Sequence, residues 1–181
     1  MLFTRTEISD VILVEPDVIG DNRGFFMETW HAEKFAAGGI AAGFVQENQS
    51  RSSQGILRGL HYQIKKPQGK LVRVLSGEIF DVVIDLRKNS ATFGQWLGMH
   101  LSADNKKMLW IPPGFAHGFY VISQQADFFY KCTDFYAPEH ERAIRWDDPD
   151  LAIDWPLIDG KPPVVSPKDE AAVAFTNAEY Y

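Results

Sequence analysis

The sequence contains a single cysteine, Cys132, and no long hydrophobic run. One cysteine cannot form an internal disulfide, and its position inside an apolar segment predicts a buried, inert thiol in a reducing compartment. No segment approaches the roughly eighteen consecutive apolar residues that a membrane-spanning helix requires. The opening stretch MLFTRTEISD also lacks the apolar core of a signal peptide. We therefore expect a cytoplasmic protein with no membrane association.

Positive charge is scarce as well. There are 18 Lys and Arg residues against 24 Asp and Glu residues, which gives a formal net charge of −6. This balance argues against nonspecific nucleic-acid binding, which depends on neutralising phosphates with basic side chains. It leaves room for a small anionic ligand, because a pocket can be basic inside an acidic protein. The 181 residues, 45% of them hydrophobic, are enough to close one core, so we expect a single domain spanning residues 1–181.

Short apolar or β-branched runs separated by turn residues dominate the chain and predict an all-β fold. Ser76-Gly77 lies between two such runs and is interpreted as a hairpin turn. Helical composition occurs only at His31–Gly39 and around Lys168–Ala174. From Asp147 onward Pro and Asp are frequent, so this part should cover the sheet as irregular chain. The pattern favours a jelly roll, sandwich or small barrel with short peripheral helices and an irregular C-terminal extension.

Polar side chains fall on strand faces that are otherwise apolar. Side chains alternate along a strand, so residues two apart share a face. This alternation places four polar residues on one predicted inner face: His61, Lys70, His117 and Tyr130. Buried polar groups are costly unless they are hydrogen-bonded, so a ligand pocket in a barrel mouth explains them better than a packed core. Strict alternation sets Arg58 opposite His61, and a bulge at Gly59 would turn both toward the pocket.

The segment PPGFAHGF (112–119) matches the Pro-x-Gly-x-x-His element of metal-binding cupins, which are small jelly-roll barrels. Their companion His-x-His element is degraded here, because Gln63 stands where the second histidine belongs. The position of the glutamate ligand falls near Pro67 and Gln68. Two histidines without an anionic ligand are a poor set for iron, zinc or manganese. We therefore expect neither metal nor cofactor, and a metal-dependent cupin is the weaker alternative.

Proton transfer suits these residues better. Imidazole titrates near neutrality and is a good general base. Removing a proton from a carbon beside a ketone leaves an enolate, whose oxygen needs a cation such as Lys70. Reprotonation from the opposite face inverts the carbon and requires a separate acid, for which the Tyr130 hydroxyl is suitable. Each residue alone also fits an ordinary structural place, so the hypothesis depends on their joint position with His61 on one face.

Several motifs occur together in a distinctive order. They are RGLHYQ (58–63), QGKLVRV (68–74), PPGFAHGF (112–119), YKCTDFYAPEHE (130–141) and SPKD (166–169). With these motifs the chain resembles the dTDP-4-dehydrorhamnose 3,5-epimerases, a family of cofactor-independent cupins, over nearly its whole length. The resemblance implies a homodimer that epimerises dTDP-4-dehydro-6-deoxy-D-glucose at carbons 3 and 5. The ketone at carbon 4 acidifies both neighbouring carbons, so one pocket can act on each in turn.

The resemblance also implies residue roles. His61 would be the base, held in its tautomer by Asp169, with Tyr130 as the acid and Lys70 beside the enolate oxygen. Asp81 is a weaker candidate for orienting the base. The implied substrate-binding residues are Arg23 and Glu28, contributed across the dimer interface, together with Gln46, Glu47, Asn48, Arg58, His117, Tyr136, Glu141 and Lys168.

Two of the binding roles have a clear physical basis. Arg58 suits the diphosphate, because a guanidinium pairs with phosphate oxygens through two parallel hydrogen bonds. Tyr136 resembles the aromatic residue that stacks on thymine. Glu47 stands where the family commonly has aspartate, a change that keeps the charge. Two alternatives stay open: an epimerase of the same fold that acts at one carbon of a related dTDP-4-keto-hexose, and a sugar-nucleotide binding module without activity.

Overall fold

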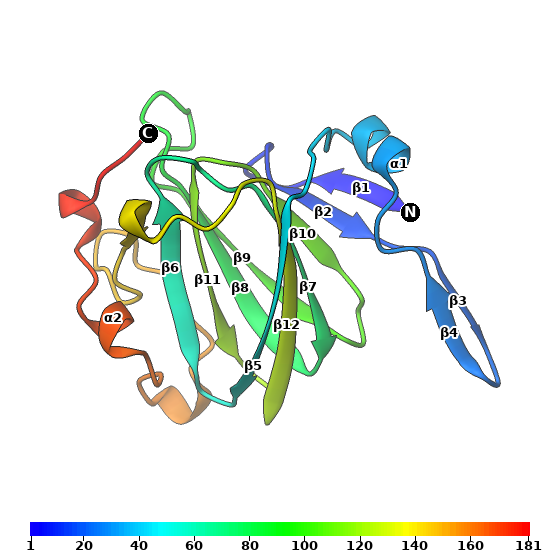
Figure 1. The fold of residues 1–181 in the computed structure, drawn as a ribbon. Helices are drawn as coiled ribbons and strands as arrows, with labels where there is room; N and C mark the ends of the chain where they lie inside the picture. Colours follow the sequence, from blue (N-terminus) through cyan, green and yellow to red (C-terminus); the bar gives the residue numbers. More distant parts are fainter.

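Two antiparallel β-sheets face each other and form the body of the molecule (Figure 1). The computed structural model describes residues 1–181. The six-stranded sheet has the order β1 (Leu2–Arg5), β2 (Ile12–Glu15), β10 (Met108–Ile111), β7 (Lys70–Ser76), β12 (Gln125–Cys132) and β5 (Gln46–Ser53). The five-stranded sheet has the order β13 (Glu141–Ala143), β6 (Leu57–Gln63), β11 (Phe115–Val121), β8 (Glu78–Asp85) and β9 (Trp96–Ser102). The predicted all-β fold is confirmed.

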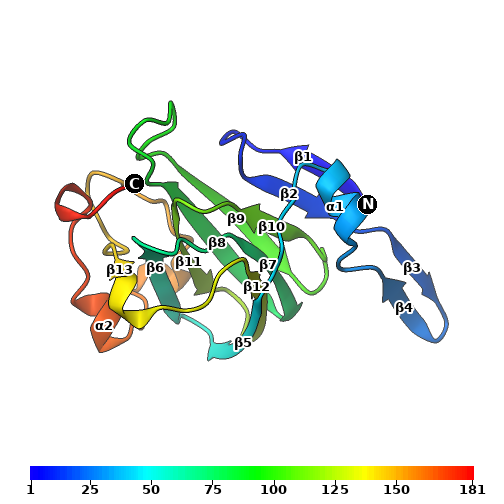
Figure 2. The same cartoon turned by 45° about the horizontal axis from the view of Figure 1, so that its top comes forward.

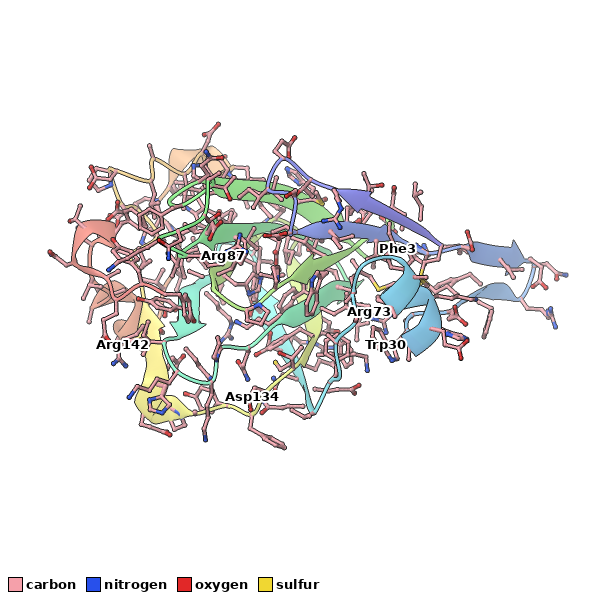
Figure 3. The ribbon with its side chains drawn as sticks, turned by 90° about the horizontal axis from the view of Figure 1, so that it is seen from above. Phe3, Trp30, Arg73, Arg87, Asp134 and Arg142 are labelled. Atoms are coloured by element: carbon pink, nitrogen blue, oxygen red, sulfur yellow. The ribbon has the colours of Figure 1, made fainter.

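A separate hairpin of β3 (Val18–Asp21) and β4 (Gly24–Met27) extends away from the two sheets (Figures 1 and 3). Helix α1 (Ala32–Ala37) lies inside the predicted helical stretch and ends at Gly38. Helix α2 (Pro167–Glu170) begins one residue before the predicted stretch and is shorter than expected. Three single-turn 3₁₀ helices complete the secondary structure: η1 (Pro138–His140), η2 (Ile158–Gly160) and η3 (Phe175–Asn177).

The hairpin predicted at Ser76-Gly77 is wrong. β7 ends at Ser76 and β8 starts at Glu78, but the two strands belong to different sheets, so the turn carries the chain from one sheet to the other. Gly77 has φ 78°, and a Cβ there would lie 2.1 Å from the carbonyl oxygen of Gln125. The glycine is therefore required by a close backbone approach as well as by its conformation. When a glycine turn joins two apolar runs, the sequence does not show whether the two strands pair with each other.

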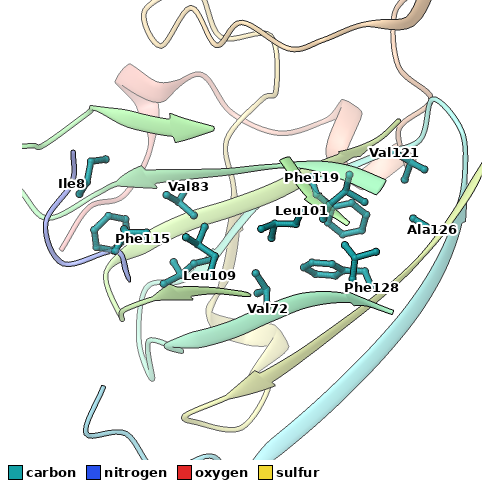
Figure 4. Close-up of a cluster of buried hydrophobic side chains, with 14 residues drawn as sticks. Ile8, Val72, Val83, Leu101, Leu109, Phe115, Phe119, Val121, Ala126 and Phe128 are labelled. Atoms are coloured by element: carbon teal, nitrogen blue, oxygen red, sulfur yellow. The ribbon is translucent and has the colours of Figure 1, made fainter. Parts of the chain in front are cut away.

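The main hydrophobic core lies between the sheets (Figure 4). Its members come from β7 to β12 and the turn before β2, and include Val72, Val74, Val83, Leu109, Phe115, Phe119, Val121 and Phe128. These residues follow the predicted alternation, since Val72 and Val74 share a face with Lys70, and Phe115 and Phe119 with His117. The core fills one part of the space between the sheets and leaves the polar residues to line the remainder.

A second cluster covers the outer face of the five-stranded sheet. Residues after Asp147 form the expected irregular chain, and Leu151 and Trp155 pack against Val82, Ile84 and further residues of the sheet. Figure 2 shows this extension running beside β6 and β13, with α2 next to them. The extension thereby carries α2 to the edge of the sheet that holds His61. No helix in the chain is long and apolar enough to cross a membrane.

Asp85, at the end of β8, is fully buried and anchors the loop that follows. Its carboxylate accepts hydrogen bonds from the Arg87 guanidinium at 2.7 Å and 2.8 Å and from the hydroxyls of Ser90 and Thr92 at 2.6 Å and 2.7 Å. Burial alone would raise the pKa of Asp85, but these donors outweigh it and lower the pKa to about 2. Because the pKa is lower in the folded state, Asp85 stabilises the protein at any pH above the pKa of the unfolded state. This stabilisation is lost as the pH falls through about 2.

We expect Asp85→Asn to reduce the free energy of unfolding at neutral pH by about 2 kcal/mol, the equivalent of the lowered pKa. The difference from the parent protein should shrink as the pH drops from about 4 toward 2, because the parent carboxylate then becomes protonated. Urea unfolding across this pH range measures the effect, with exposed Asp104→Asn as the control. An equal loss of unfolding free energy at every pH would show that the charge of Asp85 is not what stabilises the fold.

Candidate active site

One extra residue in β6 sets the direction of two polar side chains. His117 on β11 lies opposite His61, but Phe119 lies opposite Arg58, so three steps along β6 match two along β11. The extra residue lies in the Gly59 region. Gly59 has φ 135°, and a Cβ on it would lie 2.5 Å from the Cα of Gly118. The bulge brings Arg58 and His61 to the wall of one cavity, so the expectation of a bulge at Gly59 is confirmed.

His61 is paired with Asp169 of α2. The Nε2 of His61 and the Oδ1 of Asp169 are 2.5 Å apart, although 108 residues separate them in the chain. Ser166 caps α2 by accepting the N–H of Asp169 at 3.1 Å, which fixes the turn that presents the carboxylate. Burial would raise the pKa of Asp169, but the hydrogen bond with His61 outweighs it and lowers the pKa. An ionised carboxylate accepts the Nε2 proton and leaves Nδ1 with the lone pair that a base needs.

A second histidine–carboxylate pair lies on the neighbouring strands. His117 Nε2 is 2.8 Å from Asp81 Oδ2, and both side chains are buried. The expectation that Asp81 orients His61 is therefore wrong, because its one hydrogen-bonded oxygen serves His117. Burial lowers the pKa of His117, which keeps the imidazole neutral at neutral pH. Across the whole chain no three His, Cys, Asp or Glu side chains gather into a metal-binding cluster.

Lys70 and Tyr130 come from adjacent strands of the opposite sheet. Desolvation lowers the pKa of Lys70, and the charges of nearby Asp81 and Glu141 offset only part of this effect. Desolvation also raises the pKa of Tyr130, with smaller contributions from Cys132 and Glu141. The phenol is therefore fully protonated at neutral pH and can donate a proton. The ammonium of Lys70 has no carboxylate within ion-pair distance, which leaves it available to a ligand oxygen.

Two neighbouring cavities share three lining residues: His61, Lys70 and Tyr130. The first, which we call the cationic chamber, is also lined by Arg58, His117, Lys168 and Asp169, with Ser50, Ser166, Phe119 and Phe128. The second, which we call the aromatic chamber, is also lined by Tyr62, Gln63, Gln68, Phe115, Tyr136, Glu141 and Tyr181. The three shared residues are the ones expected to transfer protons and hold an enolate. A ligand ring at this junction would reach all three.

Tyr136, Glu141 and Lys168 contact one another at the edge of these chambers. The Tyr136 hydroxyl donates to Glu141 at 2.5 Å, and the Lys168 ammonium forms an ion pair with the same carboxylate. Burial would raise the pKa of Glu141, but the hydrogen bonds from Lys168 and Tyr136 outweigh it and lower the pKa. The ring of Tyr136 is half exposed and leaves a flat face toward solvent. These three predicted binding residues therefore lie together at the chamber edge.

The three polar residues predicted on β5 take different directions. Asn48 donates to the Cys132 thiol at 3.7 Å on the inner side, and Gln46 accepts the backbone N–H of Tyr136 at 2.9 Å. Glu47 points to the opposite face, where it pairs with Lys131. Strand alternation thus turns Glu47 out of the cavities of its own chain, while Gln46 supports the segment that carries Tyr136.

Arg23 and Glu28 lie outside both chambers of their own chain. Arg23 is at the tip of the β3–β4 hairpin and pairs with Asp21, and Glu28 follows β4 and pairs with Lys34 at 2.8 Å. The Arg23 side chain is exposed and that of Glu28 is partly buried, and no residue of the hairpin lines either chamber. Their expected ligand contacts can arise only if the hairpin of one chain reaches the site of another.

Sequence reasoning missed several residues that line the chambers. Ser50 follows the same alternation as Asn48, so period-two counting could have included it. Phe115 was placed on the face of His117 by that counting, but not assigned to the site. Gln68 lies in the loop between β6 and β7, and Tyr181 in the irregular extension. No periodic pattern exists in these segments, so nothing in the sequence indicated that they reach the cavity.

Two facing antiparallel sheets around a polar cavity form a cupin-type jelly roll. The chain belongs to the dTDP-4-dehydrorhamnose 3,5-epimerase family, whose model matches residues 5–177, and it is an isomerase. A relative from Pseudomonas aeruginosa is 58% identical over 182 residues, covering 100% of this chain and 99% of its own. One from Escherichia coli is 53% identical over 168 residues, covering 92% and 90%. Both are described as dTDP-4-dehydrorhamnose 3,5-epimerase.

Solved structures agree with the family. The Legionella pneumophila epimerase, in complex with dTDP-4-keto-L-rhamnose, has a TM-score of 0.94 and 53% identity, covering 98% of this chain and 94% of that one. A 3′-monoepimerase from Streptomyces bikiniensis, in complex with dTDP-quinovose, has a TM-score of 0.86 and 32% identity, covering 93% and 85%. The fold is therefore shared by enzymes that differ in how many carbons they invert.

Proposed function

We propose that this enzyme converts dTDP-4-dehydro-6-deoxy-D-glucose to dTDP-4-dehydro-L-rhamnose by inverting carbons 3 and 5, as a step in dTDP-rhamnose biosynthesis. The observation that carries the proposal is the junction of the two chambers, where a histidine paired with a carboxylate, a lysine and a protonated tyrosine line both cavities. The descriptions of the relatives support the same substrate class.

The mechanism begins when His61 removes the proton from a carbon next to the ketone. The C–H electron pair becomes the new C=C bond, and the carbonyl π electrons move to oxygen as an enolate, which the Lys70 ammonium stabilises. The carbonyl then re-forms while the carbon takes the Tyr130 phenolic proton on the opposite face, which inverts the centre. The phenolate regains a proton and the imidazolium releases one before the second carbon reacts.

Substrate binding follows the charge of the chambers. Arg58 donates to Ser52 at 2.9 Å and has no carboxylate partner, so its remaining donors suit the diphosphate in the cationic chamber. The exposed ring of Tyr136 suits stacking on the thymine base. His117, Glu141 and Lys168 border the sugar and the phosphates in this arrangement.

Product analysis by NMR in heavy water tests the proposal. Deuterium at both carbon 3 and carbon 5 of the product is the expected result, because each inversion replaces a carbon-bound proton with a solvent-derived one. Deuterium at carbon 3 alone would favour the single-centre alternative. The similarity to the S. bikiniensis 3′-monoepimerase is the reason to test it. Activity should survive prolonged incubation with a chelator, and loss under that treatment would favour a metal-dependent cupin.

We also propose that the protein is a homodimer in which the β3–β4 hairpin crosses to the neighbouring chain. The hairpin carries exposed apolar side chains, with Ile19 and Phe26 each 70% exposed, and an isolated two-stranded hairpin is marginally stable in water. Docking on a second copy would cover these residues and bring Arg23 and Glu28 near the site of the partner. A cytoplasmic location remains our expectation and is based on the single, buried Cys132.

Phe26→Asp is expected to weaken the dimer about thirtyfold or more, because it places an unpaired charge in an apolar contact. Sedimentation equilibrium measures the dissociation constant. Val164→Asp is the matched control, since Val164 is a similarly exposed apolar residue on the C-terminal extension. A dimer that is unaffected by Phe26→Asp would place the interface elsewhere.

A further inference from the structure

Tyr181 is an aromatic-chamber residue that no motif indicated, and its backbone is fixed to the segment that follows β8. The N–H of Tyr181 donates to the carbonyl of Leu86 at 3.1 Å, and the N–H of Lys88 donates to the carbonyl of Tyr181 at 3.1 Å. These two bonds pair the backbone of Tyr181 with the residues directly after β8. Gly114, with φ 98°, lies next to this pairing, and a Cβ on it would be 3.8 Å from the Tyr181 ring.

The side chain of Tyr181 is fixed as well. Its hydroxyl donates to the backbone carbonyl of Gln63 on β6, and its ring meets the Tyr62 ring edge-on, with centroids 6.1 Å apart. The Gln63 amide is itself committed, since its Nε2 donates to Lys66 at 2.7 Å and its Oε1 accepts the N–H of Ala137 at 2.9 Å. The polar atoms on this wall are satisfied within the protein, so the ring surface is what Tyr181 offers to a ligand.

The segment leading to Tyr181 is held at several further points. The Tyr62 hydroxyl donates to the Glu179 carbonyl at 2.7 Å, and Arg142 donates to the Glu179 carboxylate at 2.5 Å. Tyr180 turns the other way, where its ring packs on Phe93 at 5.0 Å and its hydroxyl donates to Phe175. The segment is therefore a preorganised wall, which costs a ligand little ordering on binding.

The placement of the chambers indicates which part of a ligand this wall meets. Arg58 and Lys168 in the cationic chamber suit the diphosphate, and the proton-transfer residues at the junction suit the keto sugar. The aromatic chamber adjoins that junction. Tyr136, the proposed thymine contact, is half exposed at its edge, and Tyr181 and the buried Phe115 line the chamber as well. An aromatic face packs well against C–H and methyl groups, which are what a 6-deoxy sugar presents away from its diphosphate.

We propose that Tyr181 is a specificity-determining residue whose ring packs against the end of the deoxy sugar farthest from the diphosphate. The inference rests on the proposed function, because it places the sugar at the junction of the chambers. The ring limits how far the sugar enters the aromatic chamber and so holds the reacting carbons beside His61 and Tyr130. A contact made equally before and during the reaction affects KM more than kcat.

Steady-state kinetics of three variants test this role. Tyr181→Ala should raise KM for the dTDP-keto sugar about tenfold while kcat stays within about twofold, and Tyr181→Phe should stay close to the parent because the ring remains. Tyr180→Ala is the matched control: it removes a tyrosine from the same segment on the side away from the chamber, so it should lower Tm without changing KM. Inhibition by dTDP alone should be unchanged in all three.

Several outcomes would overturn the inference. A folded Tyr181→Ala enzyme with the parent KM would show that the ring does not contact the sugar. An equal rise of KM in Tyr180→Ala would show that the effect comes from disordering the whole C-terminal segment and not from the Tyr181 ring. Weaker dTDP inhibition in Tyr181→Ala would place the nucleotide at this wall instead. If Tyr181→Ala does not fold, Tyr181→Leu keeps apolar volume without the flat ring and should still raise KM. A parent enzyme that does not turn over the dTDP-keto sugar would refute the proposed function itself.

Discussion

His61→Asn is expected to lower kcat about 10³-fold while leaving the dissociation constant of dTDP within about twofold, because general base catalysis of this kind contributes 10² to 10⁴. Asparagine keeps a polar side chain, although a shorter one, and has no group that takes up a proton near neutral pH. The Asn amide does not reach Asp169 as Nε2 does, but Ser166 still caps α2 by accepting the N–H of Asp169. Turnover is measured by product NMR, and dTDP binding by calorimetry.

His100→Asn is the matched control for this experiment. His100 on β9 also forms a histidine–carboxylate pair, with Nδ1 2.8 Å from Glu78, but it lies at the surface and outside both chambers. Its replacement should leave kcat unchanged. If His61→Asn retained full turnover, the assignment of the base would be refuted. If it lost dTDP binding as well as turnover, the variant would have damaged the site as a whole.

Tyr130→Phe is expected to lower the rate of inversion by about 10² to 10³, the effect of removing a positioned acid. Exchange of the substrate protons with heavy water should persist, because His61 can remove a proton and return a deuteron to the same face. Starting material labelled with deuterium would therefore accumulate while inverted product does not. Burial raises the pKa of Tyr130, so the parent enzyme should keep this acid protonated throughout the neutral pH range.

Tyr120→Phe serves as the control for the loss of a hydroxyl. Tyr120 on β11 is buried among the cluster outside the five-stranded sheet, where its hydroxyl accepts the N–H of Ile158 at 3.2 Å. It faces away from the chambers, so its replacement should reduce stability without separating exchange from inversion. Parallel loss of exchange and inversion in Tyr130→Phe would argue against a separate acid on the second face.

The sequence was most informative where a property is local. Alternation along a strand depends only on neighbouring residues, and it predicted that Lys70 and Tyr130 share faces with Val72 and Phe128, as the core confirms. The possible bulge at Gly59 could be proposed because a glycine inside a strand often marks one. Fold class and inner faces were therefore accessible from the residues themselves.

Long-range relations were not accessible in this way. The pairing of His61 with Asp169 spans 108 residues and was known only through the family resemblance. The role expected for Asp81 was wrong because sequence does not reveal which of two neighbouring histidines a carboxylate faces. The Ser76-Gly77 turn was misread because the same dipeptide can join strands within a sheet or between sheets.

The facing glycines of β6 and β11 leave almost no tolerance for change in the middle of the site. A methyl group on Gly118 would come within 2.7 Å of the Arg58 carbonyl oxygen, just as one on Gly59 would collide with Gly118. Even alanine at either position would force the two backbones apart. Deleting one residue between Arg58 and His61 would rotate one of them out of the cavity. The roles proposed for Arg58 and His61, phosphate binding and proton abstraction, therefore depend on the same bulge, and shifting this strand to alter one would be expected to disrupt the other.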